Sequence, residues 1–225
     1  TLKQQDFMSS YGGFKRIPHS NNVITIRSEL NVPTDLYTFK VLSNYSFDSL
    51  SFTKLTDFNK YDTIKGKLAN YEYLESIDEN GLHGFIILPH NVDKTQPNKY
   101  PLVLNIHGGP ESAWTNQFSY SFGSSQILAG GKAILLVNPH GSTGVSRAYT
   151  YAVRNDWGGK PLDDLLFAVK YATSKYNWID GNRRCAMGGS YGGYMVNWMR
   201  GQVVDRKEPF NCYITDDGVF DTKYT

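Results

Sequence analysis

The sequence has few cysteines, little excess charge and no long apolar run. Its 225 residues contain two cysteines, and neither belongs to a Cys-x-x-Cys pair, so we expect neither a disulfide framework nor a zinc site. A net charge of +2 provides no basic surface for nucleic acid. No apolar run approaches the roughly 20 residues that span a bilayer, so we expect no membrane segment. By contrast, 40% of the residues are hydrophobic, which suffices for one or two globular domains.

The start of the chain is typical of an internal fragment. It begins Thr-Leu-Lys-Gln, with neither an initiator Met nor an apolar leader. A signal peptide upstream of Thr1 would not be visible in these residues, and Asn44 begins a lone glycosylation sequon. The residues themselves therefore leave secretion and a cytoplasmic location both open, and they do not bear on the oligomeric state.

The pattern of the chain changes near residue 66. Before it, short β-rich runs alternate with Asn, Ser, Asp and Pro, which predicts antiparallel strands at 23–26, 36–42 and 51–55. After it, near-continuous apolar runs alternate with helical stretches, as in a parallel sheet buried on both faces. These predict strands at 85–88, 102–106, 133–137, 183–187 and 210–215, helices at 116–129, 163–172 and 191–200, and a turn at 179–182. We expect domains at 1–66 and 67–225.

The most informative segment is a G-x-S-x-G core at residues 188–192. It lies between a predicted strand and a predicted helix, which is the context of a nucleophile elbow. Such a turn holds Ser190 in a strained conformation, and a side chain at Gly188 or Gly192 would collide as the chain reverses. The alternative is a glycine-rich phosphate-binding turn. It is disfavoured because the Gly-Lys-Ser/Thr of a P-loop and the G-x-G-x-x-G of a dinucleotide site are absent.

A glycine pair follows another predicted strand. The sequence HGGP at residues 107–110 comes directly after the strand at 102–106, at the sheet edge where an elbow also lies. We expect the backbone N–H groups of Tyr191 and Gly109 to form an oxyanion hole beside Ser190. Losing one such donor typically lowers turnover about 10²- to 10³-fold. We interpret His107 as a residue that shapes this loop rather than as a general base.

These motifs together resemble the prolyl oligopeptidase family of serine peptidases, most closely its dipeptidyl-peptidase V and acylaminoacyl-peptidase branch. The matching segments occur in the family's order at 107–110, 138–144, 156–159, 188–194 and 216–220. The resemblance implies a truncated α/β-hydrolase, a mostly parallel sheet with helices on both faces. Residues 1–66 would then be the β-rich tail of a β-propeller.

The resemblance also implies an activity. It implies hydrolysis of short peptides through an acyl-enzyme on Ser190, with small peptides as the partner and neither a cofactor nor a metal. It favours secretion over a cytoplasmic location. Two positions depart from the family pattern, since His140 replaces an Arg and Val145-Ser146 replaces an aromatic-Gly pair. We therefore expect the loop after the third apolar strand to bind differently.

The remaining triad members are absent from the expected positions. In an α/β-hydrolase the acid and the histidine follow the nucleophile, but all five histidines precede Ser190. We expect the catalytic Asp and His to lie outside this chain, and the 225 residues alone to be nearly inactive. Asp216, Asp217 and Asp221 follow the elbow, and we interpret them as shaping a loop beside the substrate pocket.

Several other residues have more than one interpretation. Trp157, beside two glycines, is expected to anchor a loop rather than to touch substrate. Tyr194, Phe220 and the Tyr191 ring are candidates for either the pocket wall or the core. We expect the two cysteines, Cys185 and Cys212, to be buried thiols on neighbouring strands.

Two other functions compatible with these residues are a carboxylesterase or lipase of the same fold, and a noncatalytic binding protein on a hydrolase scaffold. The β-rich N-terminal segment favours the peptidase over a single-domain esterase. An Asp and a His at later strand ends of the complete chain would favour an enzyme over a binding protein.

Overall fold

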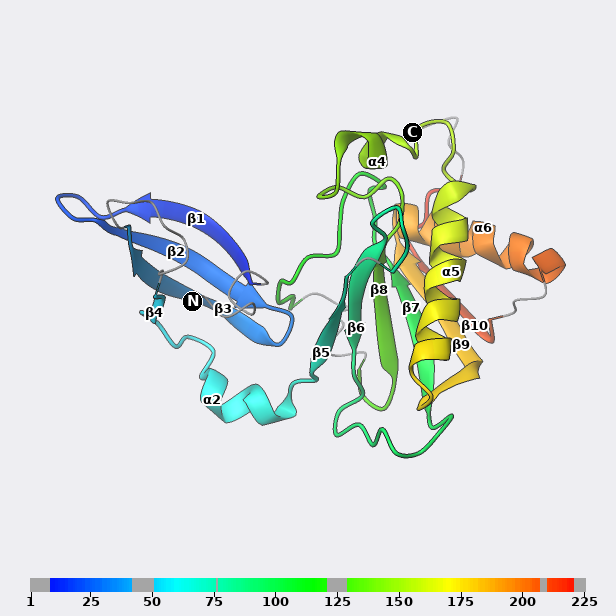
Figure 1. Ribbon diagram of the computed structural model, residues 1–225, viewed down its shortest axis with the longest axis horizontal. Helices are drawn as coiled ribbons and strands as arrows, with labels where there is room; N and C mark the ends of the chain where they lie inside the picture. Colours follow the sequence, from blue (N-terminus) through cyan, green and yellow to red (C-terminus); the bar gives the residue numbers. More distant parts are fainter. Residues whose placement is uncertain (1–8, 42–50, 76, 121–128, 207–209, 221–225) are drawn as a thin grey trace. The chain divides into compact units, whose positions relative to one another are not determined.

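The computed structural model describes residues 9–41, 51–75, 77–120, 129–206 and 210–220 (Figure 1). Two separate β-sheets occur among these residues, one of four strands and one of six. No helix in the described ranges has both the length and the apolar character needed to cross a membrane.

The six-stranded sheet has the order β10-β9-β7-β8-β6-β5. Its strands are β5 (Tyr71–Leu74), β6 (His83–Ile87), β7 (Tyr100–Ile106), β8 (Ala133–Asn138), β9 (Ile179–Gly189) and β10 (Cys212–Asp216). Strands β8, β7, β9 and β10 are parallel to one another, whereas β6 pairs antiparallel with both β8 and β5. The carboxyl ends of β7, β8 and β9 are therefore adjacent, and the loops that follow them meet at one edge of the sheet.

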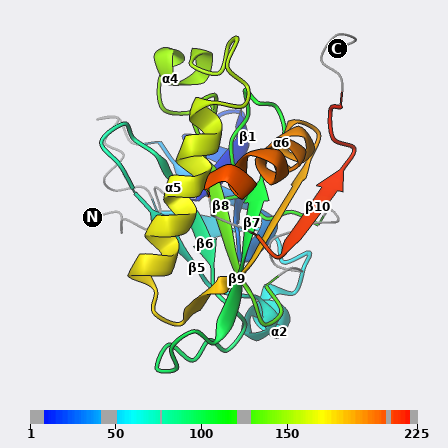
Figure 2. The same cartoon turned by 90° about the vertical axis from the view of Figure 1, so that its right-hand side faces the viewer.

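Two long helices lie over one face of this sheet (Figure 2), α5 (Lys160–Lys175) and α6 (Tyr191–Arg206). Alternate residues of the central strands, such as Leu104 and Leu135, share one apolar core with Leu165 of α5 and Met195 of α6. Leu136, which faces the other way, is also fully buried. Burial on both faces explains the near-continuous apolar runs, because each such side chain stabilises the fold by about 1.5–3 kcal/mol.

Most elements predicted in this part are present with shifted ends, but two predictions are wrong. The turn expected at 179–182 belongs to β9, where the register with β7 jumps from Pro101 opposite Asp180 to Leu102 opposite Arg184. The turn-forming residues thus sit in a bulge while the strand continues. Of the helix expected at 116–129, residues 116–120 and 129 are not helical, and 121–128 lie outside the described residues. The Asn116 carboxamide instead accepts a hydrogen bond from the Leu30 N–H at 2.7 Å.

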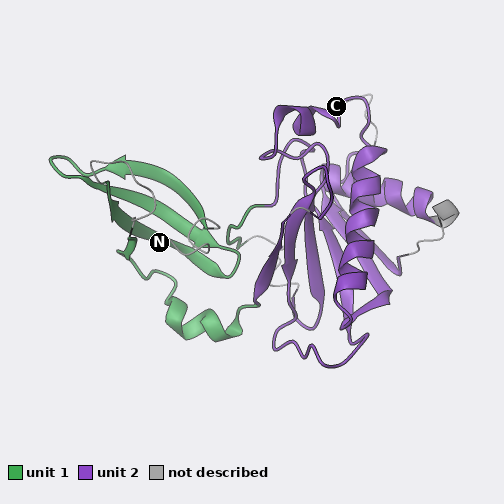
Figure 3. Cartoon of the chain, in the orientation of Figure 1, with its two compact units in different colours: residues 1–69, 115–127 green, residues 70–114, 128–225 purple. Residues whose placement is uncertain are grey.

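The chain divides into two compact units (Figure 3). The first contains residues 1–69 and 115–127, and the second contains residues 70–114 and 128–225. The chain therefore leaves the first unit, returns to it at residue 115 and leaves it again after residue 127. The domain limits at residues 66 and 67 stay a prediction.

The first unit contains an antiparallel sheet of four strands in sequence order. Its elements are β1 (Ser10–Arg16), β2 (Asn22–Glu29), β3 (Val32–Lys40) and β4 (Thr53–Lys54), followed by α2 (Tyr61–Ile64) and the 3₁₀ helix η2 (Lys65–Lys67). Strand β1 is absent from the predicted strands, since its Gly12-Gly13 pair resembles a turn. At the register shift in β1, the Thr25 hydroxyl donates to the Gly12 carbonyl at 2.9 Å, which supports this glycine-containing strand.

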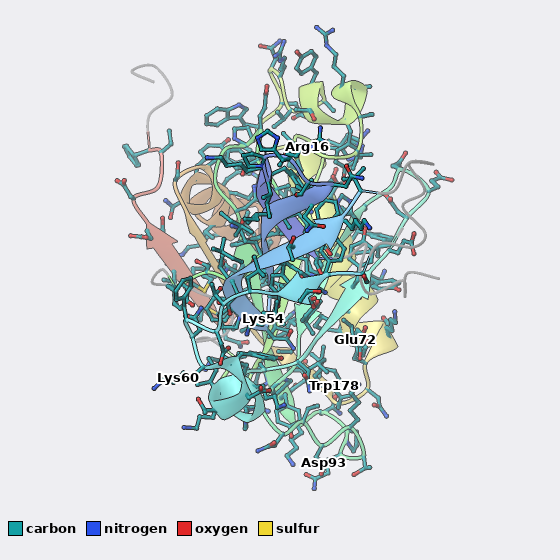
Figure 4. The ribbon with its side chains drawn as sticks, turned by 90° about the vertical axis from the view of Figure 1, so that its left-hand side faces the viewer. Arg16, Lys54, Lys60, Glu72, Asp93 and Trp178 are labelled. Atoms are coloured by element: carbon teal, nitrogen blue, oxygen red, sulfur yellow. The ribbon has the colours of Figure 1, made fainter. Side chains whose placement is uncertain are left out.

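A buried carboxylate ties β3 to β4 and to the segment that follows it. Lys54, labelled in Figure 4, places its Nζ 3.1 Å from Asp35 Oδ2. The Asp35 Oδ1 accepts hydrogen bonds from the Thr56 hydroxyl at 2.7 Å and the Phe58 N–H at 3.1 Å. Burial opposes ionisation of Asp35, but these hydrogen bonds and the ammonium group outweigh it and lower its pKa below the ordinary value.

Candidate active site

The serine turn joins the end of β9 to the start of α6. Ser190 has a φ of +56°, a left-handed conformation that costs a non-glycine residue about 1–3 kcal/mol. Its N–H donates to the Asp216 carbonyl at 3.0 Å, and its own carbonyl accepts from the Tyr194 N–H at 3.0 Å. The strained residue is thus held between β10 and the first turn of α6. The strain expected from the sequence is present.

The glycines around Ser190 are required by close backbone approaches. An ideal Cβ on Gly188 would lie 2.6 Å from the carbonyl carbon and oxygen of Gly192. A Cβ on Gly192 would fall closer still to the carbonyl oxygen of Ile106 at the end of β7. Since real Cβ atoms essentially never approach other atoms within 3.0 Å, no other residue fits without moving α6. The collision predicted from the sequence for a side chain at Gly188 or Gly192 is therefore confirmed.

The HGGP loop lies against the serine side chain. A Cβ on Gly108 would be 3.4 Å from Ser190 Cβ and 3.8 Å from Ser190 Oγ. Among the described residues, none accepts a hydrogen bond from the N–H of Gly109 or from the N–H of Tyr191. Two backbone donors, one in this loop and one directly after the serine, are therefore unused by the protein near Ser190.

His107 is buried beneath this loop with both ring nitrogens occupied. Because a carbonyl oxygen only accepts, Nδ1 carries the proton and donates to the Gly108 carbonyl at 2.7 Å. Nε2 then accepts from the Ser142 hydroxyl at 2.9 Å. Burial lowers the pKa of His107, which keeps the imidazole neutral. The ring therefore has no nitrogen left to serve as the base for Ser190, in line with the role expected from the sequence.

A buried carboxamide holds the far end of the same loop. Asn138, at the end of β8, accepts from the Trp114 N–H at 2.7 Å and donates to the Trp114 carbonyl at 3.0 Å. It also contacts His83 Nε2 at 3.0 Å. The Trp114 indole N–H donates to the Asn105 carbonyl at 3.0 Å. These contacts, none of which sequence reasoning identified, fix the loop between β7 and residue 114 to the ends of two strands.

His140 is turned into the protein and paired with a buried acid. Its backbone N–H and its Nδ1 both lie within hydrogen-bond distance of Asp164 Oδ2, at 2.7 Å and 2.6 Å, and its ring stacks on Tyr149 at 4.2 Å between centroids. Burial raises the pKa of Asp164, although the two contacts with His140 oppose that shift. The sequence analysis missed this pair. The signal was an acid on the apolar face of the helix, between Leu162 and Leu165.

The loop at 156–159 anchors α6. The Tyr191 hydroxyl donates to the Trp157 carbonyl at 2.8 Å, and the Trp157 ring meets the Tyr191 and Tyr194 rings edge-on at 5.3 and 5.5 Å. The Trp198 indole N–H donates to the Gly158 carbonyl at 2.7 Å. The Tyr191 ring, 1% exposed, is therefore part of the core, and only its backbone amide is available to the site. Trp157 has the anchoring contacts expected of it.

The acids after the elbow shape a turn. The Asp216 carbonyl holds the Ser190 N–H, and Asp217 has a φ of +46°. Gly218 packs so closely on Gly193 that a Cβ on Gly193 would lie 2.6 Å from its Cα. Phe220 is exposed, and Asp221 lies outside the described residues. Neither described acid has a histidine partner, which agrees with a structural interpretation.

The two cysteines face each other on parallel strands. Cys185 of β9 is the register partner of Cys212 of β10, and both are free thiols. Burial, with a smaller effect of the Cys212 side chain, raises the pKa of Cys185 to about 12. The prediction that both are buried is wrong. Cys185 is only partly buried, and Cys212 is exposed because it is the first residue of the outermost described strand.

The combination of topology and turn defines the class of the protein. In this mixed sheet, the parallel strand β9 leads through the strained Ser190 into α6, and a glycine loop follows the neighbouring strand β7. This arrangement is that of an α/β-hydrolase. Residues 118–225 match the model described as the prolyl oligopeptidase family. This match covers the serine turn and the strand that follows it, in agreement with the resemblance recognised in the motifs.

Named relatives agree with this assignment. The chain is 36% identical over 144 residues to dipeptidyl-peptidase 5 of Schizosaccharomyces pombe, covering 64% of this chain and 20% of that protein. It is 38% identical over 139 residues to dipeptidyl-peptidase 5 of Aspergillus fumigatus, covering 62% and 19%. The solved acylaminoacyl peptidase of Pyrococcus horikoshii superposes with a TM-score of 0.76 at 25% identity, over 94% of this chain and 32% of that one. The chain thus spans about a fifth of the length of the curated relatives it matches.

Proposed function

We propose that the protein is a serine peptidase in which Ser190 forms an acyl-enzyme with the substrate. The observation that carries this proposal is the φ of +56° at Ser190, at the strand end where the Gly108 backbone meets its side chain. Strain of this kind persists only where the surrounding structure imposes it, and it concentrates at functional sites. Here the close backbone approaches at Gly188, Gly192 and Gly193 impose it.

The proposed reaction proceeds in two halves. Ser190 Oγ attacks the scissile carbonyl carbon while a general base takes the hydroxyl proton, and the negative charge develops on the carbonyl oxygen. The N–H groups of Gly109 and Tyr191 donate to that oxygen, and the N-terminus of α6 adds its dipole. The amine then leaves with a proton from the protonated base. Water hydrolyses the acyl-enzyme in the second half and releases the acid.

The general base is proposed to lie outside these 225 residues, together with the catalytic Asp. His107 uses both ring nitrogens within the loop, and His140 is committed to Asp164. No histidine follows Ser190 in the sequence. The family order of Ser, acid and histidine therefore requires residues beyond the elbow region.

A finer proposal concerns the substrate. The relatives named dipeptidyl-peptidase 5 support release of dipeptides from short peptides, without a cofactor. The four-stranded antiparallel sheet of residues 10–54 has the strand number of a propeller blade, which supports a propeller that limits access to small peptides. The likeness to an acylaminoacyl peptidase supports a second candidate, removal of an N-acylated residue.

The first experiment tests the nucleophile in the full-length natural protein. A fluorescent fluorophosphonate is expected to label the wild type and not Ser190→Ala, because only an activated serine reacts. Ser174→Ala, an exposed serine on α5, serves as the matched control and is expected to label normally. Labelling that survives Ser190→Ala would defeat the assignment.

The second experiment separates the substrate classes. Hydrolysis of Ala-Ala-p-nitroanilide, N-acetyl-Ala-p-nitroanilide and p-nitrophenyl butyrate is compared at equal concentration. A preference for the free dipeptide anilide supports dipeptide release, and a preference for the acetylated anilide supports the second candidate. Cleavage of the ester alone would reject a peptidase in favour of an esterase. Labelling without any turnover would favour a noncatalytic descendant of the fold.

A further inference from the structure

We propose that Arg147 and Arg154, which both contact the ring of Tyr151, bind the C-terminal carboxylate of a short peptide substrate. This inference rests on the proposed function and deepens it, since it assigns one chemical group of the substrate to named side chains. The residues lie on and directly after α4 (Arg147–Tyr151), a short helix beyond the carboxyl ends of the central strands (Figures 1 and 2).

The two arginines adjoin the loop that carries the Gly109 N–H. The backbone nitrogen of Glu111 lies 2.8 Å from the position of a Cβ on Gly109. The Glu111 carboxylate lies 3.5 Å from the Arg154 Nε. One side chain therefore separates the proposed oxyanion donor from this guanidinium group. The span is about 10 Å, which an extended peptide covers in about three residues.

A tyrosine ring holds the two cations together. The guanidinium carbon of Arg154 lies 3.5 Å from the centre of the Tyr151 ring, and that of Arg147 lies 4.9 Å from the same centre. The ring attracts each cation and restricts its rotamers, so less ordering is needed when an anion binds. Each guanidinium group presents a planar fork of N–H donors that matches the two oxygens of a carboxylate.

The charge of this cluster is unbalanced. Among the described residues, Glu111 is the one acid that pairs with either arginine. The side chains of Arg154 and Glu111 are 56% and 44% exposed, and an ion pair this open to water is weak. A substrate carboxylate can therefore replace Glu111 at Arg154. It also relieves the repulsion between the two cations.

The proposed reaction indicates which carboxylate binds. When a dipeptide is released from the N-terminus, the C-terminal carboxylate stays on the departing fragment. Every short peptide with an unblocked end carries this group, whatever its side chains. A span of about three residues beyond the scissile bond matches a pentapeptide. An acidic side chain at the last residue offers the same group, so the experiment must separate the two sources.

The test compares penta-alanine with its C-terminal amide, as initial rates of hydrolysis by the full-length natural protein. We expect kcat/KM to be about 10-fold higher for the free acid at low ionic strength, and this ratio to fall as salt is added. Tri-alanine ends two residues short of the arginines, so its acid and amide are expected to react at similar rates. Ala-Ala-Ala-Ala-Asp-amide is expected to recover less than half of the gain. An equal gain for this peptide would overturn the assignment to the C-terminus.

Substitutions assign the effect to the two arginines. Arg147→Gln and Arg154→Gln are each expected to lower the acid-to-amide ratio about threefold, and the double variant is expected to bring it near 1. Glu111→Gln is expected to raise the ratio about twofold, because it removes the competing carboxylate. The matched control is Arg183→Gln, which removes another exposed, ion-paired arginine and should leave the ratio unchanged. Hydrolysis of Ala-Ala-p-nitroanilide, which has no carboxylate, should be unchanged in every arginine variant and reports on folding.

The outcomes separate this inference from the proposed function. Wild-type ratios in Arg147→Gln and Arg154→Gln, or a ratio lowered by Glu111→Gln, would overturn the carboxylate site. An equal loss for penta-alanine and the anilide would do the same, since it would indicate a general defect. Ser190-dependent hydrolysis of penta-alanine with an acid-to-amide ratio near 1 in the wild type would overturn only this inference. Fluorophosphonate labelling that persists in Ser190→Ala would overturn both proposals.

Discussion

Two adjacent glycines of β9 provide a sharp test of the elbow. An alanine Cβ at Gly188 would lie 2.6 Å from the Gly192 backbone, whereas the nearest atom to a Cβ at Gly189 is 3.6 Å away. An ordinary contact begins at 3.4 Å, so Gly188→Ala must move the first turn of α6 by 3.4 − 2.6 = 0.8 Å. Gly189→Ala requires no movement. The two substitutions are chemically identical and differ only in what lies opposite the new methyl group.

The consequences follow from that displacement. Overpacking against backbone typically costs about 1–3 kcal/mol of unfolding free energy, and a shift near 1 Å at a catalytic group costs about 10²-fold in rate. We therefore expect Gly188→Ala to slow fluorophosphonate labelling of Ser190 by about 10²-fold and to lower the free energy of unfolding in urea. Gly189→Ala is expected to match the wild type in both. If Gly188→Ala labels and unfolds like Gly189→Ala, the steric explanation of the elbow is wrong.

Two further predictions concern buried polar groups. Replacing Asn138 with Ala removes the hydrogen bonds that its carboxamide makes to the Trp114 N–H and carbonyl, so we expect the free energy of unfolding in urea to fall by about 2–4 kcal/mol. A decrease under about 1 kcal/mol would contradict the role of Asn138 in holding this loop. The pKa of Asp35 lies below its ordinary value, so the folded state binds fewer protons than the unfolded state. The contribution of Asp35 to the free energy of unfolding is therefore present above about pH 4 and is lost as the pH falls through the folded pKa. Asp35→Asn is expected to reduce unfolding free energy by about 2 kcal/mol at pH 7 and to flatten its decline between pH 5 and about pH 2. Asp62→Asn, which removes an exposed ion pair with Lys65, should keep the wild-type slope; equal slopes in all three proteins would refute the role of Asp35.

Much of the fold was predictable because its signals are local. The apolar runs at 102–106 and 133–137 became the central strands β7 and β8 with nearly the same ends. The turn predicted at 179–182 was wrong, because a bulge and a turn use the same residue types and only the register with β7 distinguishes them. Strand β1 was missed for a related reason, since its paired glycines resemble a turn until β2 is aligned beside them.

The sequence by itself determined the chemistry of the elbow. The spacing of Gly188, Ser190 and Gly192 admits few backbone paths between a strand and a helix, so the strain at Ser190 follows from short-range sterics. Only the tertiary structure decided which polar side chains meet. His107 and Ser142 are 35 positions apart, and His140 and Asp164 are 24 apart. Such pairs depend on strand order and on which loops share a sheet edge. A hydrogen bond forms over about 3 Å, so no local pattern encodes its distant partner.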